Sequence, residues 1–216
     1  MGTLPKGVTL VAVSKTKPIA DIKEAYEAGQ RDFGENKIQE MVQKADELPK
    51  DIGWHMIGHV QTNKIKYMAP FVHLIHGIDS LAALVEVNKQ AKKNNRTIDC
   101  LLQAKISKEE TKYGLSFDEI EQLLTGPEIQ NLSHIRITGL MGMASFVDEE
   151  KILNEEFASL KGFYDKLHKK MIAAENVQLE ILSMGMSGDY QLAIKNGSNM
   201  VRIGSSICGE RNYLTN

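Results

Sequence analysis

The sequence contains few cysteines, few aromatic residues and no long apolar run. Two cysteines among 216 residues, Cys100 and Cys208, provide neither a disulfide framework nor a zinc-binding pattern. No segment is apolar over the roughly 20 residues that a membrane-spanning helix needs, and the N-terminus lacks a secretory signal pattern. We therefore expect no membrane association and a cytoplasmic, reducing location.

A strong net charge is also absent. The 26 Lys and Arg residues nearly balance the 28 Asp and Glu residues, which leaves a formal net charge of −2. This balance gives no electrostatic reason to expect a nucleic acid as partner. Hydrophobic residues make up 42% of the chain and charged residues 25%, which is typical of a globular protein with one substantial core. Because no linker or low-complexity segment interrupts the chain, we expect one domain over residues 1–216, and a monomer.

Short apolar segments rich in β-formers alternate with helical patterns along the chain. The predicted strands cover residues 8–13, 32–33, 54–57, 74–76, 98–104, 135–141, 179–183 and 200–203. The predicted helices cover residues 19–28, 37–47, 63–69, 81–94, 118–124, 149–174 and 190–195. Strict alternation of strands that are apolar on both faces with helices predicts a parallel sheet covered by helices. Eight strands favour an α/β fold of the (β/α)8 TIM barrel type over a doubly wound open sheet.

In such barrels the chemistry lies on the loops after the carboxyl ends of the strands, and the loops after strands seven and eight commonly bind phosphate. Here these segments read SMGMSGDY and RIGSS. Ser187 and Ser205 offer hydroxyl donors, while Gly204 leaves the backbone N–H groups accessible. Asp189 is positioned to cap a short helix that begins at Tyr190. This pattern predicts a phosphate site, and a phosphosugar and a phosphorylated cofactor fit it equally well.

A lysine ends the first predicted strand. Val11, Val13 and Lys15 share one face of this strand, whereas Lys17 belongs to the following loop and is expected to reach solvent. Desolvation lowers the pKa of a lysine, and the neutral amine attacks aldehydes and ketones. The alternative is a lysine whose ammonium reaches solvent or pairs with Glu35. The phosphate-type loops across the barrel mouth favour the reactive amine, because pyridoxal phosphate requires both anchors.

Two other features bear on the site. Arg202 precedes Gly204 by two residues and points to the same side of the eighth strand. It either pairs with a carboxylate on a neighbouring strand or donates to a bound ligand, and its spacing leaves both open. His55 and His59 are four residues apart, but they straddle Gly58 at a strand end and have no evident third ligand. We therefore expect no metal site.

Six segments, taken in order, resemble those of the YggS/PROSC family of pyridoxal phosphate homeostasis proteins. They read VAVSKTKP, FGENKIQE, HMIGHVQTNK, GLMGMAS, SMGMSGDYQLAI and RIGSSICGER. The resemblance runs from about Val8 to the C-terminus. It implies a fold-type III barrel similar to that of alanine racemase, with pyridoxal 5′-phosphate (PLP) as cofactor.

The resemblance also implies roles for individual residues. Lys15 of the AVSK segment would carry PLP as a Schiff base, and Asn36 would lie beside its ring. Arg202 would face the pyridine nitrogen. The phosphate would be held by Ser187, Gly204 and Ser205.

The function implied by the resemblance is non-enzymatic. Such a protein keeps PLP bound and unreactive, and passes it on, with apo forms of PLP-dependent enzymes as recipients. An arginine at the ring nitrogen disfavours its protonation, which weakens the cofactor as an electron sink and suits storage. It also suits the alternative, an amino-acid racemase with Lys15 as one base, although the resemblance does not include the C-terminal β domain of alanine racemases. A Schiff-base aldolase acting on a phosphosugar is the third hypothesis.

Overall fold

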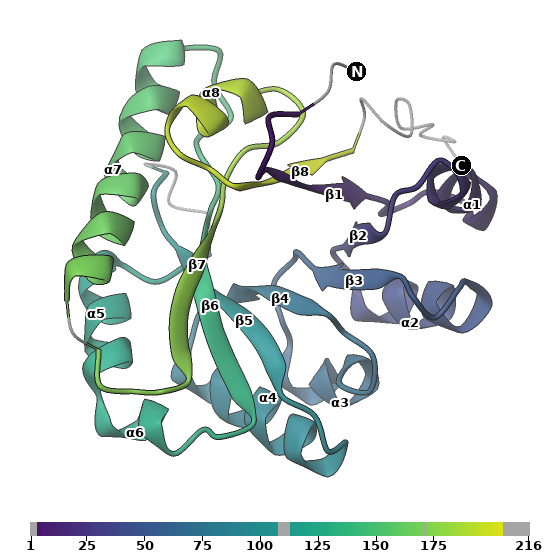
Figure 1. Cartoon of the computed structure of the whole chain (residues 1–216), viewed down its shortest axis with the longest axis horizontal. Coiled ribbons are helices and arrows are strands. Elements are labelled where there is room, and N and C mark those ends of the chain that lie inside the picture. Colours follow the sequence, from purple (N-terminus) through teal and green to yellow (C-terminus); the bar gives the residue numbers. More distant parts are fainter. Residues whose placement is uncertain (1–3, 108–112, 171, 205–216) are drawn as a thin grey trace.

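The strands form one closed parallel barrel. The computed structural model describes residues 4–107, 113–170 and 172–204. Each strand pairs with the next in chain order, and β8 closes the barrel onto β1, while the helices run along the outside (Figure 1). The strands are β1 (Thr9–Val13), β2 (Asp32–Glu35), β3 (Gly53–Met56), β4 (Leu74–Ile78), β5 (Ile98–Ala104), β6 (Ile135–Gly142), β7 (Val177–Ser183) and β8 (Met200–Ile203). The helices are α1 (Ile19–Glu27), α2 (Ile38–Glu47), the 3₁₀ turn η1 (Thr62–Lys64), α3 (Ile65–Met68), α4 (Leu81–Lys93), α5 (Phe117–Thr125), α6 (Pro127–Gln130), α7 (Glu150–Lys169) and α8 (Tyr190–Lys195).

The predicted (β/α)8 barrel is confirmed, and all eight predicted strand segments are strands. Several boundaries differ from the prediction, and one helix was not predicted. Strand β2 extends through Gly34 and Glu35, because parallel pairing with β3 continues to Glu35. Helix α6 follows α5 directly after Gly126, and its four residues are too few to show a helical period. Helix α7 ends at Lys169, before the predicted residue 174.

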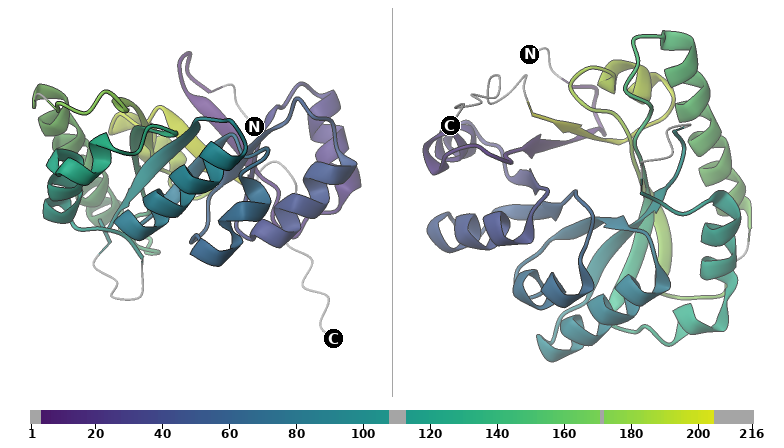
Figure 2. Two further views of the ribbon diagram at one scale, coloured as in Figure 1. Left: turned by 90° about the horizontal axis from the view of Figure 1, so that it is seen from below. Right: turned by 180° about the vertical axis from the view of Figure 1, so that it is seen from behind.

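Apolar side chains fill two layers, one inside the barrel and one between the strands and the helices. The interior cluster consists of Val11, Leu74, Leu101, Met141 and Met200. The larger outer layer lies under the helices that surround the strands in both views of Figure 2. Among the described residues, no helix combines the length and the apolar character needed to cross a membrane. Cys100 is buried and packs as a small apolar side chain.

The single tryptophan belongs to the outer layer. Trp54 lies in β3, is 3% exposed and has Phe33 of β2 as an aromatic neighbour, with ring centroids 6.2 Å apart. Both side chains are members of the cluster that packs against the helices. Since neighbouring residues of a strand point to opposite faces, the residues that flank Trp54 point toward the barrel axis. One of them is His55, which is also buried.

Candidate functional site

A pocket of about 1020 Å³ opens at the carboxyl ends of the strands. The structure brings together here five of the six residues that the sequence assigned to the site. They are Lys15, Asn36, Ser187, Arg202 and Gly204. The sixth, Ser205, lies outside the described residues. The pocket therefore lies where a TIM barrel normally holds its ligand.

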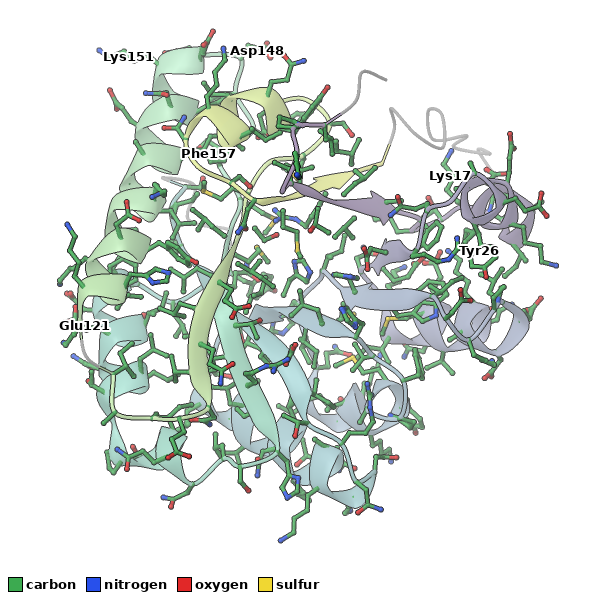
Figure 3. All side chains as sticks on the ribbon, viewed as in Figure 1. Lys17, Tyr26, Glu121, Asp148, Lys151 and Phe157 are labelled. Atoms are coloured by element: carbon green, nitrogen blue, oxygen red, sulfur yellow. The ribbon has the colours of Figure 1, made fainter. Side chains whose placement is uncertain are left out.

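Two lysines line the pocket, not one. Lys15 and Lys17 both contribute to its wall and both are partly exposed. Lys17 lies in the loop after β1 and is partly exposed, as expected, but the sequence did not indicate that it also lines the pocket, which follows because the chain turns back after β1. The Lys17 N–H donates to the Ser14 carbonyl at 3.0 Å, and Thr16 adopts a positive φ of 64°. Figure 3 shows Lys17 at the α1 side of the barrel.

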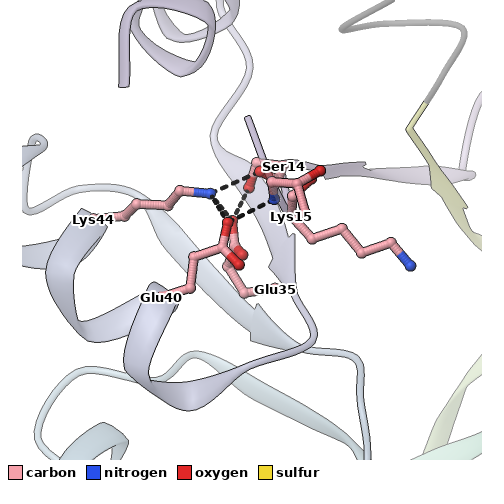
Figure 4. Close-up of polar contacts among 6 residues, drawn as sticks. Ser14, Lys15, Glu35, Glu40 and Lys44 are labelled. Carbon is pink, nitrogen blue, oxygen red and sulfur yellow. Dashed lines mark hydrogen bonds and ion pairs between the residues drawn. The ribbon is translucent and has the colours of Figure 1, made fainter. Parts of the chain in front are cut away.

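Behind Lys15, on the helix-facing side of the sheet, lies a group of buried polar residues (Figure 4). We name Ser14, Glu35, Glu40 and Lys44 the outer cluster. Glu35 Oε1 accepts hydrogen bonds from Ser14 Oγ at 2.6 Å and from Lys44 Nζ at 2.8 Å. Lys44 Nζ also donates to the Ser14 carbonyl at 2.7 Å. The charged partner of Glu35 is therefore Lys44, and not Lys15 as the alternative reading of the sequence had it.

The outer cluster also fixes the residue after Lys15. Glu40 Oε1 accepts hydrogen bonds from the Thr16 backbone N–H at 2.6 Å and from Lys44 Nζ at 2.7 Å. A β-branched residue at positive φ is strained and persists only when its surroundings hold it. The acceptor on Glu40 holds Thr16 in this conformation. As a result, the backbone is fixed on both sides of Lys15, whose side chain points away from the outer cluster in Figure 4.

Burial controls the charge state of the Glu35 carboxyl. Its side chain is fully buried, and Oε2 accepts no hydrogen bond from the described part of the chain. Burial raises the pKa of Glu35 above its usual value, although the hydrogen bonds from Lys44 and Ser14 act in the opposite direction.

Arg202 extends from β8 into the barrel, where it is 3% exposed. Its Nη1 donates to the Ser183 carbonyl at 3.0 Å and to Ser183 Oγ at 2.7 Å, and its Nη2 donates to the Gly142 carbonyl at 3.1 Å. These acceptors are neutral, so the structure shows no carboxylate pairing with Arg202 within the described residues. Burial lowers the pKa of Arg202 to about 10, which leaves the guanidinium protonated at neutral pH.

Hydrogen bonds continue from Arg202 through the barrel interior. Ser183 Oγ lies 3.2 Å from His76 Nδ1, and His76 Nε2 lies 2.9 Å from His55 Nδ1. His55 Nε2 lies 3.1 Å from Asp32 Oδ1, at the N-terminal end of β2. We name Ser183, His76, His55 and Asp32 the inner chain. It connects the pocket at one end of the barrel with the opposite end.

The expected absence of a metal site stays a prediction. His55 and His59, the pair considered from the sequence, have different partners, because His59 Nδ1 lies 2.9 Å from Asp79 Oδ2. Another group of possible ligand atoms, on Asp32, His55 and His73, lies within 4.8 Å of one another. The contact between His55 and Asp32 in that group is already explained by a hydrogen bond.

The loop between β7 and α8 forms the wall that was predicted to bind phosphate. Ser187 Oγ accepts a hydrogen bond from the Gly204 N–H at 3.2 Å, so the two predicted segments meet. Gly204 lies against β1, since a Cβ at this position would be 3.3 Å from Val13 Cβ. Asp189 occupies the N-cap position of α8, as predicted, but its side chain makes no capping hydrogen bond to that helix. Its Oδ1 accepts from the Met186 N–H at 2.5 Å and thereby closes the loop itself.

Asn36 lies where β2 ends and contacts the turn after β3. A Cβ at Gly58 would come within 2.5 Å of the Asn36 carbonyl oxygen, so only glycine permits this close approach.

The sequence analysis did not assign Gln103 to the pocket, although a glutamine within the apolar segment IDCLLQA could have indicated a site residue. Its Nε2 donates to the Tyr113 carbonyl at 2.7 Å. The other lining residues that sequence reasoning did not assign include Lys17, His59, Tyr113, Ser145 and Phe146.

The closed barrel with a lysine, an arginine and a serine–glycine loop around one mouth defines a TIM-barrel ligand-binding domain. Comparison with known proteins identifies its kind. Residues 2–212 match the family model "Alanine racemase, N-terminal domain". The chain is 37% identical over 205 residues to the pyridoxal phosphate homeostasis protein of Aquifex aeolicus, covering 94% of this chain and 87% of that protein. It is 38% identical over 213 residues to the protein of the same name from Synechocystis, covering 98% and 95%. The chain therefore belongs to the alanine racemase N-terminal domain family and, within it, to the pyridoxal phosphate homeostasis proteins.

Solved structures agree with this assignment. PipY of Synechococcus elongatus without PLP superimposes with a TM-score of 0.88 at 35% identity, covering 95% of this chain and 94% of that chain. The structure of PipY with PLP bound gives a TM-score of 0.84 at 34% identity. The alanine racemase of Clostridium difficile shares the fold, with a TM-score of 0.78 at 15% identity, and 55% of that chain is covered.

Proposed function

We propose that this protein binds PLP in the pocket at the barrel mouth, holds it covalently on Lys15 and passes it on without catalysing a reaction of its own. The observation that carries the proposal is the convergence of Lys15, Asn36, Ser187, Arg202 and Gly204, from separate loops, on one pocket. The printed names of the relatives, and PLP in one PipY structure, support the same ligand.

The donor set fits the cofactor. When bound, PLP supplies an aldehyde that condenses reversibly with an amine, and Lys15 provides that amine from a fixed backbone. The hydroxyl of Ser187 and the backbone beside Gly204 would donate to the phosphate, each such hydrogen bond contributing roughly 1.5–3 kcal/mol. Ser205 would add a further hydroxyl. Asn36 would lie beside the ring.

Arg202 fits storage of the cofactor, although it does not by itself distinguish storage from racemisation. Its guanidinium is a donor and a cation at neutral pH, so an acceptor facing it, the pyridine nitrogen in our assignment, is kept unprotonated. An unprotonated ring withdraws electrons weakly, which protects a stored cofactor from side reactions. We further propose that the protein is a single-domain monomer of the cytoplasm and that apo PLP-dependent enzymes receive the cofactor.

The test is the visible spectrum of the purified protein with PLP, followed by borohydride reduction and peptide mapping. We expect a yellow protein that is labelled at Lys15 and not at Lys17, and loss of the label in Lys15→Ala. Lys17→Ala is the matched control, because Lys17 lines the same pocket. Label on Lys17, or a colourless protein, would overturn the assignment.

A racemase would be detected separately. Incubation of the PLP-loaded protein with single enantiomers of common amino acids should leave their optical rotation unchanged. Loss of rotation that disappears in Lys15→Ala would replace the carrier function with racemisation.

A further inference from the structure

The inner chain connects the Arg202 guanidinium with the Asp32 carboxylate, and the hydrogen-bonding roles of these two groups are fixed. The Arg202 guanidinium has only donors, whereas an ionised carboxylate has only acceptors. Burial acts to raise the pKa of Asp32, but the hydrogen bond from His55 and the electrostatic effects of His55 and His73 together outweigh it and hold this pKa below its usual value. Asp32 is therefore an acceptor at neutral pH. Every group between these two ends must pass a hydrogen onward in the same direction.

This direction determines both histidine tautomers. Ser183 Oγ accepts from Arg202 Nη1, so its own hydrogen is directed to His76 Nδ1. His76 then carries its hydrogen on Nε2 and donates it to His55 Nδ1. His55 in turn carries its hydrogen on Nε2 and donates it to Asp32 Oδ1. Each histidine uses one donor and one acceptor, so no member of the chain has a repulsive contact.

The two histidines are neutral in this arrangement. Burial lowers the pKa of His55, and burial together with the charge of Arg202 lowers that of His76 well below the usual value. A second cation beside Arg202 would lack a counter-ion in the barrel interior. The neutral chain instead presents an oriented row of dipoles to the guanidinium.

We propose that His76, His55 and Asp32, acting through Ser183, are positioning residues that hold the Arg202 guanidinium in one orientation toward the pocket. The inference rests on the proposed function in that Arg202 is assigned to face the cofactor ring. The contacts to Ser183 and Gly142 occupy one side of the guanidinium. Arg202 also lines the pocket, so in this proposal its remaining N–H donors serve an acceptor bound there. The inner chain thereby prevents the guanidinium from turning toward alternative acceptors.

The first experiment needs no cofactor. Long-range ¹H–¹⁵N correlation spectra of the histidine rings at pH 7 distinguish the two neutral tautomers. We expect His55 and His76 both to carry the hydrogen on Nε2. In Asp32→Ala, which removes the acceptor of the His55 Nε2–H, we expect mixed tautomers at His55, while Arg202 and Ser183 still favour Nε2–H at His76. A fixed Nδ1–H tautomer at His76, or a His55 ring unchanged in Asp32→Ala, would overturn the proposal.

The second experiment measures the PLP-loaded protein. The absorption maximum of the bound cofactor should shift, and PLP should dissociate about tenfold faster, in His76→Leu, as expected for one weakened charge-assisted hydrogen bond. His76→Gln, which keeps one donor and one acceptor, should recover most of both properties. Asp32→Ala should show smaller changes in the same direction.

The control is His168→Leu, which removes a histidine of α7 that contacts Tyr164 outside the barrel. It should change neither the spectrum nor the dissociation rate. If His76→Leu does not fold, the positioning role is tested with Asp32→Ala instead. An absorption spectrum and a PLP dissociation rate equal to those of the unmodified protein would then contradict that role. If PLP does not bind at all, the proposed function fails, whereas the tautomer result still decides the arrangement of the inner chain.

Discussion

The inner chain and the outer cluster lie on opposite faces of the barrel wall, share only strand β2, and hold their charges differently. The outer cluster places Lys44 against Glu35 and Glu40 in direct ion pairs. The inner chain joins the Arg202 cation to the Asp32 carboxylate through two neutral histidines and a serine. One network concentrates its charges at short range, and the other keeps them at opposite ends of the barrel.

Because of this difference, the two proposed anchors of the cofactor, Lys15 and Arg202, are each held by a different group of residues. The outer cluster binds the backbone on both sides of Lys15, so it fixes where the amine begins. The inner chain contacts the Arg202 side chain and leaves the backbone of β1 alone. Each network lies on the face of the sheet opposite to the other, so a change in one should leave the other largely intact.

The largest expected effect on stability follows from replacing Lys44, the cation of the outer cluster. Lys44→Met leaves the Glu35 carboxylate buried without its charged partner, and loss of one member of a buried ion pair costs about 3–5 kcal/mol. We expect the free energy of unfolding to fall by this amount in urea titrations at pH 7. Lys161→Met is the control, because it removes an exposed i,i+4 pair with Asp165 and should cost less than about 1 kcal/mol. Equal losses in the two variants would contradict a buried role for Lys44.

The pH dependence of that loss distinguishes the two networks further. The folded pKa of Glu35 is raised, so its contribution to stability is fully present below the unfolded pKa near 4.5 and is lost as the pH rises through the folded value. Removing Lys44 raises the folded pKa more. The stability difference between the unmodified protein and Lys44→Met should therefore grow from pH 4.5 to pH 7. A difference that stays constant over this range would assign the cost to packing alone.

The variant Arg202→Lys tests the cation to which the inner chain is hydrogen-bonded. An ammonium cannot reproduce the forked contacts with Ser183 and Gly142, so at least one buried carbonyl loses its donor. We expect a loss of about 2 kcal/mol in the free energy of unfolding. Arg136→Lys provides the control, because Arg136 makes its forked contact with Asp99 on the exposed surface and should lose less than about 1 kcal/mol.

The smallest effect concerns the strained residue beside Lys15. Asparagine adopts positive φ more readily than threonine, so Thr16→Asn should stabilise the protein by about 0.5–1 kcal/mol. Thermal unfolding should show a correspondingly higher midpoint. Thr16→Ala retains the strain and should show no such gain. Equal midpoints for the asparagine and alanine variants would mean that Glu40, and not local strain, determines this turn.

The barrel could be predicted from the sequence because most strands are short apolar segments followed by helical patterns. Glycine, serine and lysine after those strands indicated a phosphate site and a reactive amine, whereas the roles of Asn36 and Arg202 came only from the family resemblance and stay predictions. The turn that returns Lys17 to the pocket could not, since it depends on a positive φ at Thr16 and on an acceptor 24 residues away, Glu40.

The sequence also did not predict the contacts within the outer cluster and the inner chain. Lysine is usually exposed on a helix, yet Lys44 of α2 faces the barrel strands and is only 5% exposed. His55 and His76 are 21 residues apart, and Ser183 follows His76 by 107 residues. Their contact results from closure of the barrel, which brings the interior faces of distant strands together. No local period encodes such pairs.

Trp54 gives the protein an optical signal of its own. As the single tryptophan of the chain, it accounts alone for the indole fluorescence, and its place in the apolar layer between strands and helices shields it from water. Its emission should lie at short wavelength in the folded protein and move to longer wavelength when the layer between strands and helices opens. Unfolding of each variant can thus be followed without an attached dye, from a residue that lies outside the cofactor pocket.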